Sequence, residues 1–394
     1  MRLVLMLAEL LAVGVGWFLA GRLLGDPWRG RVQNVLKAWL TVRIFWLLFA
    51  HEVKDTDGSS VATGTLILRA LEQIDVRTFA LFCVAAAGIK FAGILASMQR
   101  WILMLRGQRI ELPFRHVFGS FLIGRFIGTF LPSTLGLDGY TLYDAARFSG
   151  RTVEASAAKF LEKIIGPIGI FLSFLVALPF GMNLLYDHTE IFPTRAAAQA
   201  AALAGAGVSL AIVGVLLAVL WFPGVVQWGI ERLPLPGKAR LNSIVARVSN
   251  AAAAYKNHKL ILLQALALSF VVHFTTAAMY YFTALAIGAA GAQFWPVVLG
   301  STVQILATVL SPITIAGEGI RELAQLLVLQ HMIGAGAAVA SAALGFWAAE
   351  GLTLFGGVFW WIRGPAYSPA WCRVNGVQVD YAEAARASAK NTNG

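Results

Sequence analysis

Long hydrophobic runs separated by short polar segments dominate the pattern of the chain. A transmembrane helix needs about 20 predominantly apolar residues to cross a hydrocarbon core of roughly 30 Å. Seven runs reach or approach this length, at about residues 3–24, 33–50, 79–103, 154–180, 196–222, 260–287 and 336–362. The second run is the weakest, because Lys37 and Arg43 interrupt it. The pattern therefore predicts an all-α polytopic membrane protein with about seven crossing helices.

Two further apolar stretches, 114–150 and 294–333, are each interrupted by a similar polar sequence. The interruptions read PSTLGLDG over residues 132–139 and PITIAGEG over residues 312–319. Proline removes a backbone donor and glycine tolerates unusual backbone angles, so each sequence ends one helix and lets another begin. The helix-breaking residues are Pro132, Gly136 and Gly139 in the first stretch and Pro312, Gly317 and Gly319 in the second. We therefore predict two helical hairpins.

The distribution of Lys and Arg predicts how these segments are oriented. Bases gather in two loops, with Arg100, Arg106, Arg109 and Arg115 in the first and Arg232, Lys238, Arg240, Arg247, Lys256 and Lys259 in the second. Because short basic loops stay on the cytoplasmic side, we expect the N-terminus outside and the C-terminus in the cytoplasm. Both hairpins must then be re-entrant, entering and leaving the membrane on one side. They enter from opposite sides, which is the arrangement of an inverted-topology repeat.

This topology divides the chain into five parts. They are the N-terminal helices with an outside loop (1–78), repeat 1 (79–222), a basic cytoplasmic linker (223–259), repeat 2 (260–362) and a cytoplasmic tail (363–394). The sequence ASAA opens the crossing helix after each hairpin, at 155–158 and 340–343, and supports the repeat. Chance matches in a chain rich in small residues are the alternative. The tail is polar, and we expect it to be mobile.

Composition agrees with a membrane protein and narrows the function. The 394 residues are 58% hydrophobic and 13% charged, and the mean hydropathy is +0.72. The net charge of +11 would favour a nucleic-acid partner in a soluble protein, but here the bases flank apolar runs, where they set topology and contact lipid phosphates. Cys83 and Cys372 form no disulfide framework, and the six His residues have no metal-binding spacing. Without a nucleophile or phosphate-binding motif, we expect no enzyme activity, cofactor, metal or nucleic-acid partner.

Charged residues inside apolar segments are the candidate binding residues, because they are costly there unless they face a partner or a cavity. They are Arg125, Asp138, Arg147, Lys159, Glu162 and Lys163 in repeat 1 and Glu318, Arg321 and Glu322 in repeat 2. Helix N-termini that meet at mid-membrane would favour an anion, and a guanidinium binds phosphate with two hydrogen bonds, so Arg321 is the first candidate. The alternatives are structural ion pairs and, for Asp138 and Glu318, capping of helix starts. We expect Lys90 and His273 to pack or snorkel.

Three sequences carry a resemblance to a known family. They are Arg100-Trp101 before a basic loop, GTFLPSTLGLD at 128–138 and PITIAGEGIRE at 312–322. A fourth motif of the family is matched loosely by Glu162-Lys163 before Gly166. Over roughly residues 80–362 the chain resembles the transmembrane region of lysylphosphatidylglycerol synthases, the flippase domain of the multiple peptide resistance factor and its stand-alone relatives. Leu137, Thr141 and Lys163 depart from the family pattern, so the head group can differ from those of better-known members.

The resemblance implies translocation of a lipid between leaflets. The family moves aminoacylated phosphatidylglycerol in the fused proteins, and polyprenyl-phosphate-linked sugars or hopanoid-type lipids are suspected for stand-alone members. We therefore expect a flippase for an anionic or phosphate-bearing lipid in the cell (inner) membrane, working as a homodimer or beside a lipid-biosynthesis enzyme. The alternatives are an ion-coupled transporter for a small anionic solute and an accessory subunit of a membrane lipid-modifying enzyme.

Overall fold

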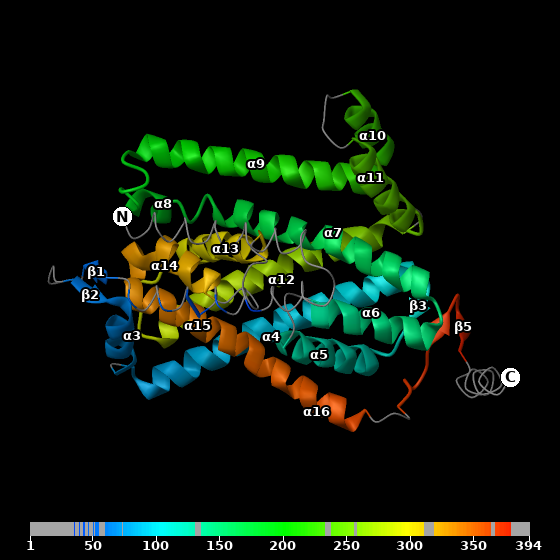
Figure 1. Cartoon of the computed structure of the whole chain (residues 1–394), viewed down its shortest axis with the longest axis horizontal. Coiled ribbons are helices and arrows are strands. Elements are labelled where there is room, and N and C mark those ends of the chain that lie inside the picture. Colours follow the sequence, from blue (N-terminus) through cyan, green and yellow to red (C-terminus); the bar gives the residue numbers. More distant parts are fainter. Residues whose placement is uncertain are drawn as a thin grey trace.

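The structure is a computed structural model of the whole chain (Figure 1). It describes residues 52–54, 60–72, 74–130, 135–232, 238–255, 258–310, 319–363 and 367–379, with six single positions between 35 and 50. Several predicted features lie outside these residues, namely the run 3–24, most of the run 33–50, Pro132, Pro312, Gly317 and Glu318.

Five described helices are long and apolar enough to cross a membrane. They are α4 (Val76–Gly107), α7 (Thr152–Ala177), α9 (Arg195–Trp221), α12 (Lys259–Ala286) and the continuous helix formed by α15 (Ala335–Gly351), η2 (Leu352–Leu354) and α16 (Phe355–Ile362). These helices coincide with the last five predicted runs. The prediction of an all-α polytopic membrane fold is therefore confirmed.

Helices α4 and α12 form the centre of the bundle and pack against each other along their length. They run in opposite directions, since α4 ends beside the right-hand strands in Figure 1 and α12 ends on the left. Small residues allow the close approach, with Gly93 of α4 against Thr275 of α12. Helix α7 covers α12 at a second close contact, where a Cβ on Gly169 would overlap the backbone of Ser269.

The two interrupted stretches form helical hairpins. The first pairs α5 (Phe114–Phe130) with α6 (Leu135–Ser149), and the second pairs α13 (Phe294–Leu310) with α14 (Ile320–Ile333). Figure 1 shows the first hairpin in the right-hand part of the bundle and the second in the left-hand part. Helix α7, which follows the first hairpin, packs on α13 of the second, and α16, which follows the second, packs on α5 of the first.

Glycine has a different role at each predicted helix break. Helix α6 begins at Leu135, so Gly139, which was expected to break the helix, lies one turn inside it. Gly136 lies in the first turn, where a Cβ would overlap the backbone of Gly128 on the opposite arm. In the second hairpin Gly319 directly precedes α14 with φ of 82°, in the left-handed region that glycine adopts without strain.

The predicted mobile tail is partly ordered. Strands β4 (Arg373–Val374) and β5 (Val377–Gln378) continue a three-stranded antiparallel sheet that begins with β3 (Ile110–Glu111). Cys372 is fully buried in the main hydrophobic cluster, with Tyr367 packed against it. The expectation of mobility is wrong for residues 367–379, because a few apolar side chains and backbone pairing offset the polar composition.

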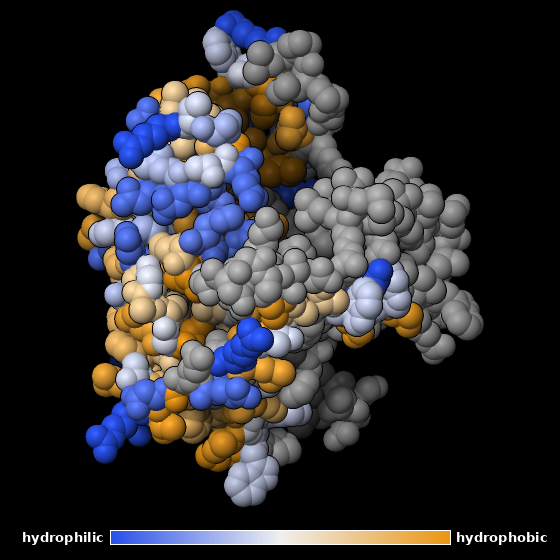
Figure 2. Space-filling model, turned by 90° about the vertical axis from the view of Figure 1, so that its left-hand side faces the viewer, coloured by the Kyte–Doolittle hydropathy of each residue, from blue (hydrophilic) through white to orange (hydrophobic). Residues whose placement is uncertain are grey.

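The remaining elements lie at the ends of the bundle. They are β1 (Glu52–Lys54), β2 (Ser60–Ala62), α3 (Thr63–Glu72), α8 (Asn183–Asp187), α10 (Pro223–Arg232) and α11 (Lys238–Ala253). Figure 2 views the molecule from the left-hand end of Figure 1 and shows hydrophilic side chains gathered in the upper described part of that face. By contrast, Leu203, Leu210 and Val215 are exposed along the flank formed by α9. Polar ends and apolar flanks are typical of a membrane-embedded bundle.

Candidate functional site

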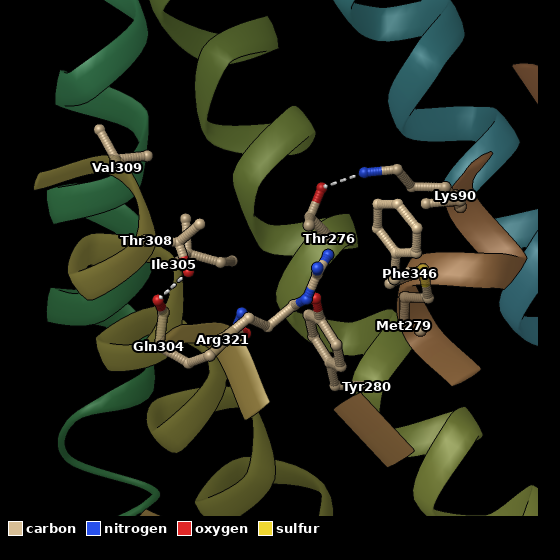
Figure 3. Close-up of a pocket in the computed structure, with 12 residues that line it drawn as sticks. Lys90, Thr276, Met279, Tyr280, Gln304, Ile305, Thr308, Val309, Arg321 and Phe346 are labelled. Carbon is tan, nitrogen blue, oxygen red and sulfur yellow. Dashed lines mark hydrogen bonds between the residues drawn. The ribbon is translucent and has the colours of Figure 1, made fainter. Parts of the chain in front are cut away.

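A cavity of about 160 Å³ lies where the two central helices meet the second hairpin (Figure 3). Its polar lining comes from four helices and consists of Lys90 on α4, Thr276 and Tyr280 on α12, Gln304 and Thr308 on α13, and Arg321 on α14. Met279 and Phe346 contribute apolar walls. Because Lys90 and Thr276 lie near the middle of α4 and α12, the cavity is at mid-length of the longest helices.

Two cations define the electrostatics of this cavity. The Lys90 ammonium donates to Thr276 Oγ1 at 3.2 Å, and the Arg321 guanidinium lies 4.4 Å from the centre of the Phe346 ring. Figure 3 shows both charged groups pointing into the same space. The Glu322 carboxylate lies behind the guanidinium, so the three charged groups leave a net positive charge at the cavity. In a region of low dielectric this net charge favours an anion.

Glu322 positions Arg321 without itself lining the cavity. Its Oε2 accepts from the Gly319 amide at 2.7 Å, which caps the start of α14, and its Oε1 accepts from Arg321 Nε at 3.1 Å. Only 2% of Glu322 and 7% of Arg321 is exposed. The buried Glu322 carboxylate therefore holds the Arg321 guanidinium at Nε, and the rest of the guanidinium faces the cavity.

Buried polar atoms in the second hairpin have unmet hydrogen-bonding capacity. Among the described residues, Gln304 Oε1, Ser301 Oγ and both amide atoms of Gln325 have no hydrogen-bond partner. All three residues are at most 1% exposed, and Gln304 lines the cavity. Because buried polar groups are normally hydrogen-bonded, this part of the hairpin suits water or a polar ligand.

A second charged cluster lies in the first repeat around Glu162. Its Oε1 is 3.2 Å from Arg100 Nη2, and its Oε2 is 2.7 Å from Lys159 Nζ. Arg100 also donates to Ser269 Oγ at 3.0 Å, so the cluster joins α4, α7 and α12. Glu162 is 6% exposed, and its two cationic partners compensate a charge that is costly to bury alone.

Asp138 extends this cluster to the first hairpin. It forms an ion pair with Lys163 and lies 3.8 Å from Lys159 Nζ, which is itself 3.7 Å from the centre of the Trp101 ring. The side chain of Lys163 is 50% exposed, whereas that of Lys159 is 8% exposed. Lys163 is therefore the accessible cation of this cluster, and the Asp138 side chain forms ion pairs with α7.

The structure brings together some predicted site residues and leaves others apart. Asp138, Lys159, Glu162 and Lys163 form one cluster, and Arg321 and Glu322 form another. Arg147 lies apart from both, exposed, with its guanidinium 5.0 Å from the Phe148 ring, and Arg125 is half-buried on α5.

Sequence reasoning missed two cations. Arg100 was assigned to a basic loop but lies inside α4, and Lys90 was expected to pack or snorkel but lines the cavity. Their position in the sequence could have identified them as site residues, because both lie well inside the span 76–107. A charge that far from a helix end needs a partner or a cavity.

A third polar cluster ties the open end of the first hairpin to α16. His116 Nε2 lies 2.7 Å from Asp144 Oδ2, and Ser120 donates to the same oxygen. Arg363 donates to Ser120 Oγ at 2.9 Å and to the His116 carbonyl at 2.5 Å. Ser120 and His116 both contact Asp144, whereas a hydrolytic triad needs a serine that donates to histidine. The cluster is a structural latch.

The ordered tail adds a further contact to this latch. The Tyr367 hydroxyl lies 3.1 Å from His116 Nδ1, and the Tyr367 ring stacks on the imidazole with centroids 5.8 Å apart. Burial raises the pKa of the Tyr367 phenol, so it stays protonated and able to donate. In the described part of the chain, no group of three His, Cys, Asp or Glu residues could hold a metal ion.

Comparison with known proteins agrees with this architecture. The family model described as "Lysylphosphatidylglycerol synthase TM region" matches residues 34–356, which include both hairpins, the cavity and the Glu162 cluster. No curated protein and no solved structure matches the chain. Because the family model covers most of its length, this multi-pass membrane protein belongs to the lysylphosphatidylglycerol synthase transmembrane-region family.

Proposed function

We propose that this protein is a flippase, not an enzyme, and that it moves an anionic, phosphate-bearing lipid between the leaflets of the cell (inner) membrane. The observation that carries the proposal is the mid-length cavity into which Lys90 and Arg321 point from different helices. Charge-assisted hydrogen bonds from an ammonium and a guanidinium suit a phosphate. Family membership supports a lipid-related role.

An inverted-topology repeat would give this site access from both sides. The opposite placement of the two hairpins supports it, as does the reciprocal packing of α7 on α13 and of α16 on α5. We place the end with α10 and α11 in the cytoplasm because its sequence is basic. With the predicted seven crossings, the C-terminus is then inside and the N-terminus outside. Both hairpins are then re-entrant, and movement of each would open the cavity to one leaflet in turn.

The Glu162 cluster is the second element of the proposed path. Its buried members largely compensate one another, so they support the bundle. The half-exposed Lys163 reaches a passing head group by exchanging Asp138 for phosphate. We therefore propose Lys163, and not Lys159 or Glu162, as the first candidate for substrate contact in the first repeat.

A transporter for a small anionic solute is the second candidate, since the same two cations would bind a soluble anion. The apolar wall of the cavity favours a lipid instead. Val309 lines the cavity and is 57% exposed, which places one wall at the outer surface of the bundle. A lipid needs such a lateral route for its acyl chains, whereas a solute site reached from water does not.

Transport of a fluorescent lipid tests the proposal. We expect proteoliposomes to move head-group-labelled phosphatidylglycerol across the bilayer, read out as dithionite-accessible fluorescence. Arg321→Gln and Lys90→Gln should each slow this movement at least ten-fold, whereas Arg147→Gln, which removes an exposed arginine, should not. Unchanged rates in both cavity variants, or uptake of soluble phosphate without lipid movement, would contradict the proposal.

A further inference from the structure

Helices α10 and α11 lie across the end of α9 and do not run along the long helices of the bundle (Figure 1). One face of α11 is fixed to the protein, because Val245 and Val248 are buried in the main hydrophobic cluster. The segment that follows is held as well, since the Tyr255 hydroxyl donates to the Met104 carbonyl at 2.5 Å. The pair is therefore a fixed arm of the bundle.

A second set of apolar side chains on this arm is exposed. Val225 and Trp228 of α10 are 64% and 55% exposed, and Leu241 and Ile244 of α11 are 37% and 42% exposed. The two residues of each helix are three positions apart and so share a face. The described structure leaves Val225 and Trp228 largely uncovered and Leu241 and Ile244 partly uncovered.

Basic residues continue both apolar faces. Arg232 follows Trp228 by one turn, and its guanidinium lies 3.9 Å from the centre of the indole ring. Arg247 follows Ile244 by three positions, also about one turn. Lys238 lies at the start of α11, and Glu231 is the one acidic residue in the sequence 223–253. Each helix thus carries apolar residues beside bases, the pattern of a helix that lies in a membrane interface.

We propose that α10 and α11 form an arm that binds the anionic surface of the membrane. Val225, Trp228, Leu241 and Ile244 enter the boundary between head groups and acyl chains, and Arg232, Lys238 and Arg247 contact the phosphates of acidic lipids. Charge complementarity favours this occupant over a second protein. The crosswise placement in Figure 1 favours it as well, because helices that lie across the bundle can follow the membrane surface. The arm gathers acidic lipids beside the bundle whatever lipid the cavity binds.

Quenching of Trp228 by brominated lipids tests the proposal in the full-length protein in nanodiscs. The chain has 12 Trp, so the signal of Trp228 is taken as the difference between the wild type and Trp228→Phe. We expect brominated phosphatidylglycerol to quench Trp228 several-fold more than brominated phosphatidylcholine at equal content, with the preference falling as salt rises. Each base near an anionic surface contributes roughly a five-fold preference at low salt.

The triple variant Arg232→Gln, Lys238→Gln, Arg247→Gln should bring quenching by the two lipids to parity while leaving Trp228 in contact with both. The control Arg106→Gln, Arg115→Gln removes exposed bases elsewhere at the same end and should keep the preference. Quenching by neither lipid, equal quenching in the wild type, or a preference that survives the triple variant would each overturn the proposal. Arg321→Gln should leave the result unchanged, which separates this test from that of the cavity.

Discussion

Glu162 and Glu154 lie two turns apart on α7, yet their surroundings differ. Glu162 is enclosed by Arg100 and Lys159. Glu154 pairs with Arg151 at the start of the helix, where the side chains of Arg151 and Glu154 are 33% and 29% exposed. An exposed ion pair contributes about 0 to 1 kcal/mol. Removing one partner of a buried pair costs about 3 to 5 kcal/mol, because the other charge stays buried without compensation.

We therefore predict that Glu162→Gln lowers the free energy of unfolding by roughly 3 kcal/mol or more, since two buried cations lose their counter-charge. Glu154→Gln on the same helix is the matched control and should cost less than about 1 kcal/mol. Thermal and denaturant unfolding in detergent measure both variants. Equal midpoints for the two would mean that Glu162 is hydrated and is not a buried anchor.

Sequence could identify the stripe Lys159, Glu162, Lys163, because residues three and four apart share a helix face. It could not identify Arg100 and Lys90 as site residues, because their partners Glu162 and Thr276 are far away in the chain. Sequence also could not show which of Lys159 and Lys163 is accessible. Their exposure differs because of packing against Asp138, Trp101 and Glu162.

The first hairpin shows how two glycines of one motif acquire different roles. Gly136 lies where α6 crosses α5 against the Gly128 backbone, whereas a Cβ on Gly139 would meet nothing within 4 Å. Sequence predicted both hairpins, because proline and glycine in an apolar stretch end helices. It could not locate the start of α6, because local propensity leaves several starting positions open within one turn.

We predict that Gly136→Ala and Gly139→Ala have opposite effects. Alanine at 136 forces the arms apart and should cost about 1 to 3 kcal/mol, the range for overpacking. Alanine at 139 has room and should stabilise the helix by up to about 1 kcal/mol. Unfolding midpoints measure both, and lipid movement shows whether Gly139 has the hinge role that its sequence suggests. A loss of transport in Gly139→Ala without a loss of stability would establish that role.

At the scale of the whole molecule, the described polar side chains form three main clusters. The latch of His116, Ser120, Asp144 and Arg363 lies at one end, and the Glu162 cluster and the Lys90–Arg321 cavity lie inside the bundle. Hydropathy alone predicted the membrane class and the five described long helices. It missed the order of the tail, because Tyr367 and Cys372 pack on a hydrophobic cluster, and β4 pairs with β3, whose residues are far away in the chain.

The central claim is that Lys90 and Arg321 bind one anionic head group. Binding of short-chain phosphatidylglycerol to the wild type, Lys90→Gln, Arg321→Gln and the double variant tests it most directly, by calorimetry in detergent. Each single change should weaken binding by about 1.5 to 3 kcal/mol, the range for a hydrogen bond to a charged group. The double change should cost clearly less than the sum, because the two residues share one phosphate. Additive losses, or unchanged affinity in either single variant, would contradict the account.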